Sequence, residues 1–200
     1  MPDAEKNLSK ALAVLDLDPD FPAQRAKAVK LVVLDVDGVL TDGGLYYNDA
    51  GLAFKRFDVQ DGLGIRQAMR AGIEIALISG MKSGALEQRA ADLGITECHA
   101  GRFHKLPCLL EIMQKNNLEW ENVACMGDDV IDLSMLRLAG LAVAVRNAQP
   151  EAKFLAHYIS PLAGGRGAVR QVLRHILAAQ GRQEELLNYF LSLEEETERQ

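Results

Sequence analysis

The sequence predicts an α/β fold, in the form of a three-layer Rossmann-like sandwich with a central parallel sheet. From Lys30 onward, short apolar runs alternate with amphipathic segments, and the connections between them are short. This alternation is typical of right-handed β-α-β units, whose helices cover both faces of a parallel sheet. The chain has 200 residues, of which 48% are hydrophobic and 25% are charged. It is therefore long enough for one compact domain with a substantial core.

The first strand of this sheet is expected at residues 31–35, where an apolar run rich in β-branched side chains ends before Gly38. Such a run is typical of a buried strand in a parallel sheet. The later elements follow from the same alternation. In chain order, they are a helix near 62–71, a strand at 74–79, a helix at 84–93, a short strand near 96–99, a helix at 105–116, a strand at 122–126, a helix at 131–139, a strand at 141–145, a helix at 149–155 and a strand at 157–159.

Two segments flank the predicted core domain, which we assign to residues 30–181. Residues 4–15 and 22–29 predict two short helices, separated by a breaker that contains prolines. We interpret residues 1–29 as a helical lead-in rather than a domain. Residues 182–200 are expected to form a C-terminal helix and an acidic tail, which stays in solvent as charge runs usually do.

A β-hairpin is predicted at residues 45–57, between the first two strands of the sheet. Two β-prone runs there surround an Asn-Asp-Ala-Gly turn, which is a hairpin signal. A lone two-stranded hairpin is marginally stable in water, so we expect this aromatic hairpin to pack against another part of the protein or against another subunit. It could cover its own domain or pair with the same hairpin of a neighbouring subunit.

Composition and charge exclude two broad classes. The formal net charge is −6 and the pI is about 5.3, and no stripe of basic residues is present that could neutralise a nucleic-acid backbone. No apolar stretch approaches the roughly 20 residues of a membrane span, and the first residues lack the apolar core of a signal peptide. We therefore expect a cytoplasmic protein that binds neither nucleic acid nor membrane.

The three cysteines, Cys98, Cys108 and Cys125, do not have the spacing of a disulfide framework. Reduced thiols in a reducing compartment fit this pattern best. Cys98 and Cys108, together with His99 and His104, loosely resemble a zinc set, but their spacing matches no standard zinc finger. We interpret them as buried thiols and exposed imidazoles beside the end of a strand.

Asp35 and Asp37 follow the first predicted strand and are the most informative residues of the chain. The carboxyl ends of the strands are where open α/β sheets bind ligands. Side chains two residues apart on an extended chain share a face, so the two carboxylates could converge on one substrate. Two like charges this close require a compensating cation.

A second acidic cluster, Asp128, Asp129 and Asp132, follows the apolar run 123–126. Acidic residues at a helix start can serve as caps. Two clusters of acids at strand ends of one small sheet instead favour a metal site, since magnesium prefers a few hard carboxylate oxygens completed by water.

Two further strand ends carry groups that suit an anion. Ser79 and Gly80 follow the strand at 74–79 and place a hydroxyl and free backbone N–H groups before a helix, as phosphate sites do. Lys105 opens a helix, where a cation is unfavourable for the helix dipole unless it has another partner. Taken singly, each of these residues has an ordinary explanation as a turn residue or a solvated lysine.

In chain order, the strand-end groups resemble the four motifs of the haloacid dehalogenase superfamily. The resemblance is to its capless 3-deoxy-D-manno-octulosonate 8-phosphate phosphatases and covers roughly residues 30 to 181. It is carried by the segments 34–43, 61–65, 93–95, 127–129 and 164–170.

The resemblance implies magnesium-dependent phosphomonoester hydrolysis through an aspartyl-phosphate, in the synthesis of lipopolysaccharide precursors. It makes Asp35 the nucleophile, while Asp37 is the general acid for the departing sugar oxygen and then the general base for water. A carboxylate can serve as a covalent phosphoryl acceptor, and the transfer needs an in-line nucleophile and charge stabilisation.

The same resemblance implies the ligands of the metal and of the phosphate. Magnesium would be held by the Asp35 side chain, the Asp37 backbone carbonyl and Asp128, with Asp129 or Asp132 in a supporting role. The transferring phosphoryl group would be bound by Ser79, Gly80 and Lys105, and this lysine would also offset the crowded carboxylates.

The chain departs from the family pattern after Gly80. Close family members usually continue with Gly-Arg-Lys, whereas this chain has Met81 and Lys82. A guanidinium can bind a carboxylate or phosphate with two parallel hydrogen bonds, and methionine cannot. We expect this change to affect the choice of substrate but not hydrolysis itself. Arg166 or Lys82 would supply the missing positive charge. We group Asp61 with these two residues as a residue that contacts the substrate or a neighbouring subunit. A nine-carbon sialic-type sugar acid phosphate is the alternative substrate.

The spacing of the motifs leaves no room for a separate cap domain, so water must be excluded from the site in another way. The resemblance implies a homotetramer in which four hairpins meet and the loop near Arg166 folds over a neighbour's site. The alternative from another functional class is a noncatalytic assembly module that has kept this fold.

Overall fold

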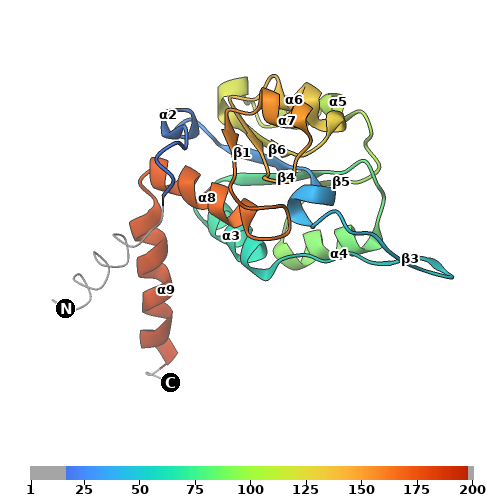
Figure 1. Ribbon diagram of the computed structural model, residues 1–200. Helices are drawn as coiled ribbons and strands as arrows, with labels where there is room; N and C mark the ends of the chain where they lie inside the picture. The colour runs from blue at the N-terminus through green and yellow to red at the C-terminus, as the bar shows by residue number, and fades with distance from the viewer. Residues whose placement is uncertain (1–16, 198–200) are drawn as a thin grey trace.

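The computed structural model describes residues 17–197 and has the predicted three-layer α/β architecture, with a parallel six-stranded sheet between two layers of helices (Figure 1). The strand order is β5-β4-β1-β6-β7-β8, and all neighbouring pairs are parallel. The strands are β1 Leu31–Leu34, β4 Glu74–Ile78, β5 Glu97–His99, β6 Val123–Gly127, β7 Leu141–Ala144 and β8 Tyr158–Ile159.

Strand β1 lies at the centre because all four of its residues are apolar and can be buried on both faces. It pairs with β4 on one side and β6 on the other, with Leu34 opposite Leu77 and Met126. The carboxyl ends of these three strands therefore lie side by side, and the segments that follow them meet at one edge of the sheet.

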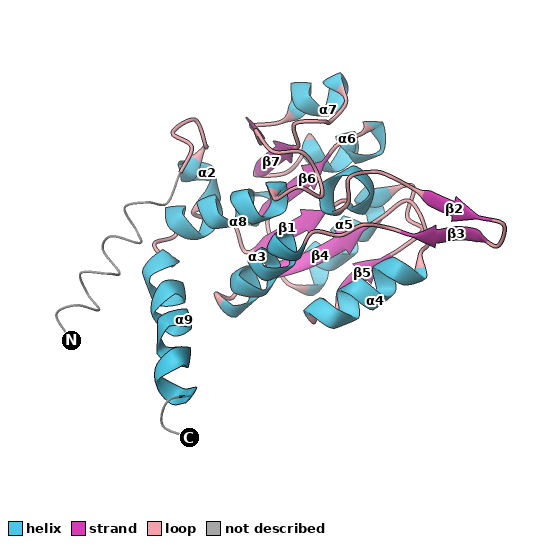
Figure 2. Ribbon diagram, turned by 60° about the horizontal axis from the view of Figure 1, so that its bottom comes forward, coloured by secondary structure: helices cyan, strands magenta, loops and turns pink. Residues whose placement is uncertain are grey.

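The helices form the two outer layers (Figures 1 and 2). One face of the sheet carries α3 Val59–Arg70, α4 Gly84–Leu93 and α8 Ala168–Ala179, and the other carries α5 Lys105–Lys115, α6 Leu133–Leu136 and α7 Pro150–Leu155. In Figure 1, the C-terminal helix α9 Gln183–Thr197 extends away from the body of the sheet. The acidic stretch before Thr197 thus continues this helix, and the last three residues lie outside the described chain.

Three predicted helices differ from the structure by more than one residue at an end. Helix α3 begins at Val59, earlier than expected, because the Asp58 carboxylate accepts hydrogen bonds from the backbone N–H groups of Gln60 and Asp61. The helix predicted at 131–139 is a turn of 3₁₀-helix followed by the short α6, since Asp129 and Asp132 form a capping box there.

The helix predicted at 22–29 is reduced to α2, Ala23–Ala26. The side chain of Gln180, directly after α8, donates to the carbonyls of Ala26 and Val29, and these contacts hold the chain beyond α2 against the end of α8. The helix predicted at 4–15 lies outside the described residues.

The predicted hairpin is present as β2 Tyr46–Asn48 and β3 Gly51–Phe54, and it projects from the body of the protein (Figure 2). The rings of Tyr46 and Phe54 stack with centroids 4.4 Å apart, and both side chains are exposed. At the foot of the hairpin, Thr41 and Phe57 form an isolated antiparallel bridge. The hairpin therefore does not fold back to cover its own domain.

Within residues 17–197, the connections between the strands hold no separate cap domain. Between β1 and β4 the chain forms the hairpin and α3, and between β5 and β6 it forms α5 and a short 3₁₀ turn, Trp120–Asn122. Within the described residues, no helix has both the length and the apolar character needed to cross a membrane.

Candidate active site

The candidate active site lies at the carboxyl edge of the sheet, where the chain leaves β1. The Asp35 N–H donates to the carbonyl of Met126 at 3.0 Å, which fixes the start of the loop beside β6. The loop then turns tightly at Gly38, whose φ of +108° suits glycine. A Cβ at this position would lie 2.0 Å from Oδ2 of Asp128, so glycine also lets the two acidic segments approach closely.

Three carboxylates and one lysine form the centre of the site. Oxygens of Asp35, Asp128 and Asp132 lie within 4.8 Å of one another, and among the described residues this is the only group of three metal-ligating side chains so close. Lys105 is fully buried between them: its Nζ contacts Oδ1 of Asp35 and lies 2.6 Å from Oδ1 of Asp132. The lysine predicted to need a partner at the start of its helix thus has two.

The charges of this cluster do not balance. Burial raises the pKa of Asp35 to about 6, with Lys105 opposing and Asp132 adding to the shift. Burial and the charges of Asp35 and Asp132 raise the pKa of Asp128 to about 8. Three carboxylates around one ammonium leave excess negative charge that a divalent cation would compensate. Hard carboxylate oxygens with this excess charge fit magnesium.

Asp132 and Asp129 are largely occupied by the protein itself. The second oxygen of Asp132, Oδ2, accepts from the backbone N–H groups of Asp128 and Asp129 at 3.0 and 3.2 Å, while Oδ1 faces Lys105. Oδ1 of Asp129 accepts from the Val130 N–H at 2.6 Å. The structure therefore brings Asp132 into the carboxylate cluster as a support for Lys105, and places Asp129 at its border as a cap.

Ser79 is buried at the end of β4, next to Asp37. Its Oγ is 3.4 Å from Oδ2 of Asp37 and 3.0 Å from the carbonyl of Met81, and it accepts from the Met81 N–H at 3.1 Å. The structure thus brings Ser79 and Gly80 to the same edge as the carboxylates.

The Lys82 side chain lies against Gly101, where a Cβ would be 2.8 Å from Cγ of the lysine.

Lys55 is a site residue that the sequence reasoning missed. It follows β3 at the foot of the hairpin, its side chain has no exposed surface, and its Nζ lies 2.5 Å from Oδ1 of Asp37. No motif marks this lysine, because its role depends on the hairpin returning to the catalytic loop. The sequence signal that could have indicated this role is the position of Lys55, directly after a predicted hairpin strand and two residues before Phe57.

The glycine-rich loop after β8 packs against the catalytic loop. A Cβ on Gly164 would lie 1.6 Å from the Gly38 carbonyl oxygen, so this close approach requires glycine. The Gly165 N–H donates to the carbonyl of Val39 at 2.9 Å. Arg166 is exposed, with Nη2 at 3.5 Å from Oδ2 of Asp42. The loop thus supports the backbone of residues 38–42 within its own chain.

Asp61 lies behind this loop rather than in the open part of the site. Its buried carboxylate accepts from the backbone N–H groups of Gly167 and Arg170 at 3.2 and 2.8 Å. Burial raises its pKa to about 6, against the effect of these hydrogen bonds. The structure therefore uses Asp61 to hold the start of α8, and its predicted place with Arg166 and Lys82 in a substrate or neighbour loop stays a prediction.

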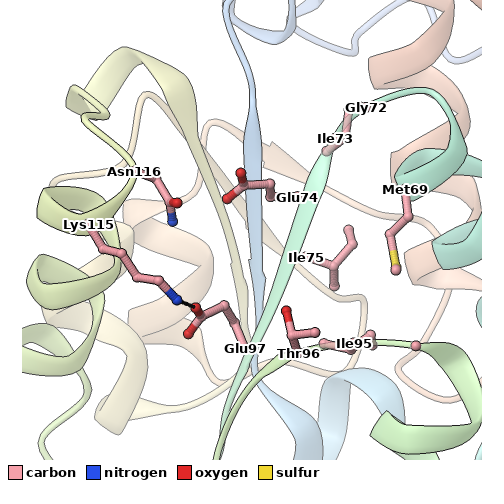
Figure 3. A pocket seen from close by; sticks show the side chains of 11 residues that line it. Met69, Gly72, Ile73, Glu74, Ile75, Ile95, Thr96, Glu97, Lys115 and Asn116 are labelled. Atoms are coloured by element: carbon pink, nitrogen blue, oxygen red, sulfur yellow. Dashed lines mark hydrogen bonds and ion pairs between the residues drawn. The ribbon is translucent and has the colours of Figure 1, made fainter.

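A separate hollow of about 460 Å³ lies at the opposite edge of the sheet, at the amino ends of β4 and β5 (Figure 3). Glu97 and Lys115 form an ion pair at its rim, and Glu74, Thr96 and Asn116 also line it. None of the predicted catalytic residues lines this hollow.

Comparisons with known proteins agree with this geometry. The haloacid dehalogenase-like hydrolase family matches residues 91–173. The 3-deoxy-D-manno-octulosonate 8-phosphate phosphatase of Escherichia coli K12 is 44% identical over 161 residues, which are 80% of this chain and 86% of that protein. The Yersinia pestis enzyme of the same name is 42% identical, over 82% of this chain and 88% of its own.

Solved structures are similar over most of the fold. The Moraxella catarrhalis 3-deoxy-D-manno-octulosonate 8-phosphate phosphatase, in complex with magnesium, phosphate and the sugar acid KDO, has a TM-score of 0.83 and 38% identity, and the match covers 86% of this chain and 99% of that one. The cobalt-bound deoxy-D-mannose-octulosonate 8-phosphate phosphatase of Haemophilus influenzae has a TM-score of 0.77 and 40% identity, over 79% of this chain and 92% of that one.

Proposed function

Because this chain belongs to the 3-deoxy-D-manno-octulosonate 8-phosphate phosphatases of the haloacid dehalogenase-like hydrolases, we propose that it hydrolyses this sugar acid phosphate to the free sugar acid and phosphate. The reaction would be a step in lipopolysaccharide precursor synthesis in the cytoplasm. The observation that carries the proposal is the cluster of Asp35, Asp128 and the buried Lys105 at the carboxyl edge of the sheet. A relative of this fold binds magnesium, phosphate and the sugar acid.

In the proposed reaction, a carboxylate oxygen of Asp35 attacks phosphorus and the bond to the sugar oxygen breaks. Asp37 gives its proton to the departing oxygen, which produces the sugar alcohol and an aspartyl-phosphate. Asp37 then takes a proton from water, whose oxygen attacks phosphorus and releases phosphate and the Asp35 carboxylate. Lys105 holds Oδ1 of Asp35, which leaves the other oxygen of this carboxylate for the attack.

The residues present fit a magnesium ion held by the side chains of Asp35 and Asp128 and the backbone carbonyl of Asp37, with Asp132 behind them and Asp129 at the border. When bound, the ion would neutralise charge on the transferring phosphoryl group. Ser79, the Gly80 backbone and Lys105 would bind phosphoryl oxygens, because a hydroxyl, N–H groups and an ammonium complement that charge.

Magnesium affinity is expected to fall as the pH is lowered from about 8 to about 6. Burial raises the pKa of Asp128 to about 8 and that of Asp35 to about 6. A carboxyl must lose its proton to bind a metal, so protons retained below these pKa values compete with the ion. Titration calorimetry in buffers of different ionisation enthalpy should show proton release on binding within this range.

The matched controls are Asp128→Asn and Asp129→Asn. Asp128→Asn should bind magnesium weakly and release fewer protons. Asp129→Asn should release close to the parental number of protons, because Asp129 lies outside the cluster and its charge contributes less to the raised pKa of Asp128 than burial, Asp35 and Asp132 do. An affinity that does not change with pH, or no difference between the two variants, would contradict the assignment.

We also propose a homotetramer in which the hairpins meet. The support for it is the projecting hairpin with exposed Tyr46, Tyr47 and Phe54, together with the missing cap domain. In sedimentation, the parent should be larger than a monomer, and Tyr47→Ser combined with Phe54→Ser should shift it toward the monomer. A parent protein that is monomeric and fully active at assay dilution would exclude this assembly.

The experiment that tests the function is phosphate release from a panel of phosphorylated sugar acids in the presence of magnesium. We expect the highest kcat/KM for 3-deoxy-D-manno-octulosonate 8-phosphate. Met81 leaves the second motif without the usual guanidinium, so a nine-carbon sialic-type sugar acid phosphate is part of the panel. A clear preference for the nine-carbon compound would make that compound the substrate in place of the octulosonate. If no phosphomonoester is turned over, the result would favour a noncatalytic assembly module.

A further inference from the structure

Lys55 is a buried cation at the foot of an otherwise exposed hairpin. Its side chain is inaccessible to solvent, and its Nζ is 2.5 Å from Oδ1 of Asp37. An ammonium removed from water is unfavourable unless it is paired. The pairing is therefore what holds Lys55 in place, and it acts on the residue to which we assign proton transfer.

The two oxygens of Asp37 are held differently. Oδ1 accepts from Lys55, whereas Oδ2 has only the long contact of 3.4 Å to Ser79 Oγ among the described residues. A serine hydroxyl has one hydrogen, and the carbonyl of Met81, at 3.0 Å, is the nearer acceptor for it. Oδ1 is thus fixed, and Oδ2 remains available for a proton.

The two residues that follow Lys55 anchor the hairpin foot. Phe57 forms the bridge to Thr41 of the catalytic loop. Nη1 of Arg56 donates to the Gly165 carbonyl at 2.6 Å and lies 3.7 Å from Oδ2 of Asp42. The hairpin foot is thus anchored on the catalytic loop and on the glycine-rich loop, so the ammonium approaches Asp37 from a defined direction.

We propose that Lys55 is a positioning residue, which holds Oδ1 of Asp37 so that Oδ2 is directed at the oxygen of the departing alcohol. The inference rests on the proposed function only in requiring phosphomonoester hydrolysis with Asp37 as the acid, and not on a particular sugar. It gives the hairpin a catalytic part in its own chain, beyond any contact between subunits.

Substrates with different leaving groups can distinguish a positioning role of Lys55 from a purely structural one. An alkoxide leaving group, as in any sugar phosphate, needs a proton as the bond to phosphorus breaks, whereas p-nitrophenolate is stable without one. Since kcat/KM covers only the steps up to release of the first product, it reports the acid step and not the later attack of water. A misplaced acid should therefore slow alkyl phosphates far more than p-nitrophenyl phosphate.

The test compares the parent, Lys55→Met, Asp37→Asn and the double variant on two substrates, the best alkyl phosphate of the panel and p-nitrophenyl phosphate. Methionine keeps much of the apolar stem and removes the charge and the donors. We expect Lys55→Met to lower kcat/KM for the alkyl phosphate by about 10-fold to 10²-fold and to change that for p-nitrophenyl phosphate only a few-fold. In the Asp37→Asn background the same substitution should have no further effect, because it acts through Asp37.

Arg56→Met is the matched control, since it loosens the same hairpin foot without removing the contact between Lys55 and Asp37. Because the ammonium and its contact with Asp37 remain in this variant, it should lower kcat/KM for the alkyl phosphate less than Lys55→Met does. Thermal unfolding of each variant establishes that it is folded at the assay temperature. Equal losses on both substrates with Lys55→Met, or an undiminished loss in the Asp37→Asn background, would overturn the proposal.

The test of Lys55 can be decided independently of the test of the proposed substrate. If the parent hydrolyses other alkyl phosphates but not the octulosonate, the proposed function fails while the comparison of leaving groups remains decisive for Lys55. If the octulosonate is the best substrate and Lys55→Met leaves the ratio of the two kcat/KM values unchanged, the function stands and the positioning role is wrong.

Discussion

Asp35→Asn is expected to lower the rate of phosphate release by about 10⁴-fold or more, in line with the loss of a covalent nucleophile. Asp35 is 2% exposed, directly follows β1 and is held by Lys105. The amide has nearly the same shape as the carboxylate but is a poor nucleophile, so the fold should be retained while the attack on phosphorus is lost. Phosphate release under saturating substrate and magnesium measures the effect.

The control for this substitution is Asp49→Asn, at the exposed turn of the hairpin. It makes the same chemical change far from the carboxyl edge and should release phosphate at the parental rate. Rapid quenching with labelled substrate should trap label on the parent protein and none on Asp35→Asn. Covalent catalysis at Asp35 would be wrong if the variant released phosphate as fast as the parent.

The sheet and most of the site could be predicted because their signals are local. A strand buried on both faces needs a continuous apolar run, and the run at 31–34 became the central β1. Parallel strands bring their carboxyl ends to one edge, so residues far apart in the chain, such as Asp35, Ser79 and Lys105, could be expected to meet.

The remaining features depend on tertiary contacts that no spacing records. Lys55 reaches Asp37 only because the hairpin foot returns to the catalytic loop, 18 residues later in the chain. Asp61 lies in the first turn of α3, where it could be taken for a substrate residue. However, α8 packs beside it, and Gly167 before that helix and Arg170 within it donate their N–H groups to its carboxylate. The predicted helix at 131–139 was interrupted because Asp132 faces Lys105 and the backbone of Asp128.

Lys105→Met is expected to destabilise the protein by about 3–5 kcal/mol, the usual effect of removing one partner from a buried charge cluster. Lys105 is fully buried between Asp35 and Asp132, so its loss leaves these carboxylates close together without a cation. Activity should also be lost, because the variant lacks the ammonium proposed to bind the phosphoryl group. Chemical denaturation at neutral pH, without magnesium, measures the change in the free energy of unfolding.

The cause of this destabilisation can be separated from a packing defect by its dependence on charge. In the parent, burial already raises the pKa of Asp35 to about 6 although Lys105 opposes the shift, so removing the lysine should raise it further. As the pH falls through this raised value the carboxyl gains a proton in the folded state, and the repulsion that destabilises Lys105→Met is relieved. The difference in stability between Lys105→Met and the parent should therefore shrink at lower pH, on addition of magnesium, and in the double variant with Asp132→Asn.

A cavity left by a poorly packed methionine would give a difference in stability that none of these three changes reduces. That result would show that Lys105 contributes through its volume rather than its charge.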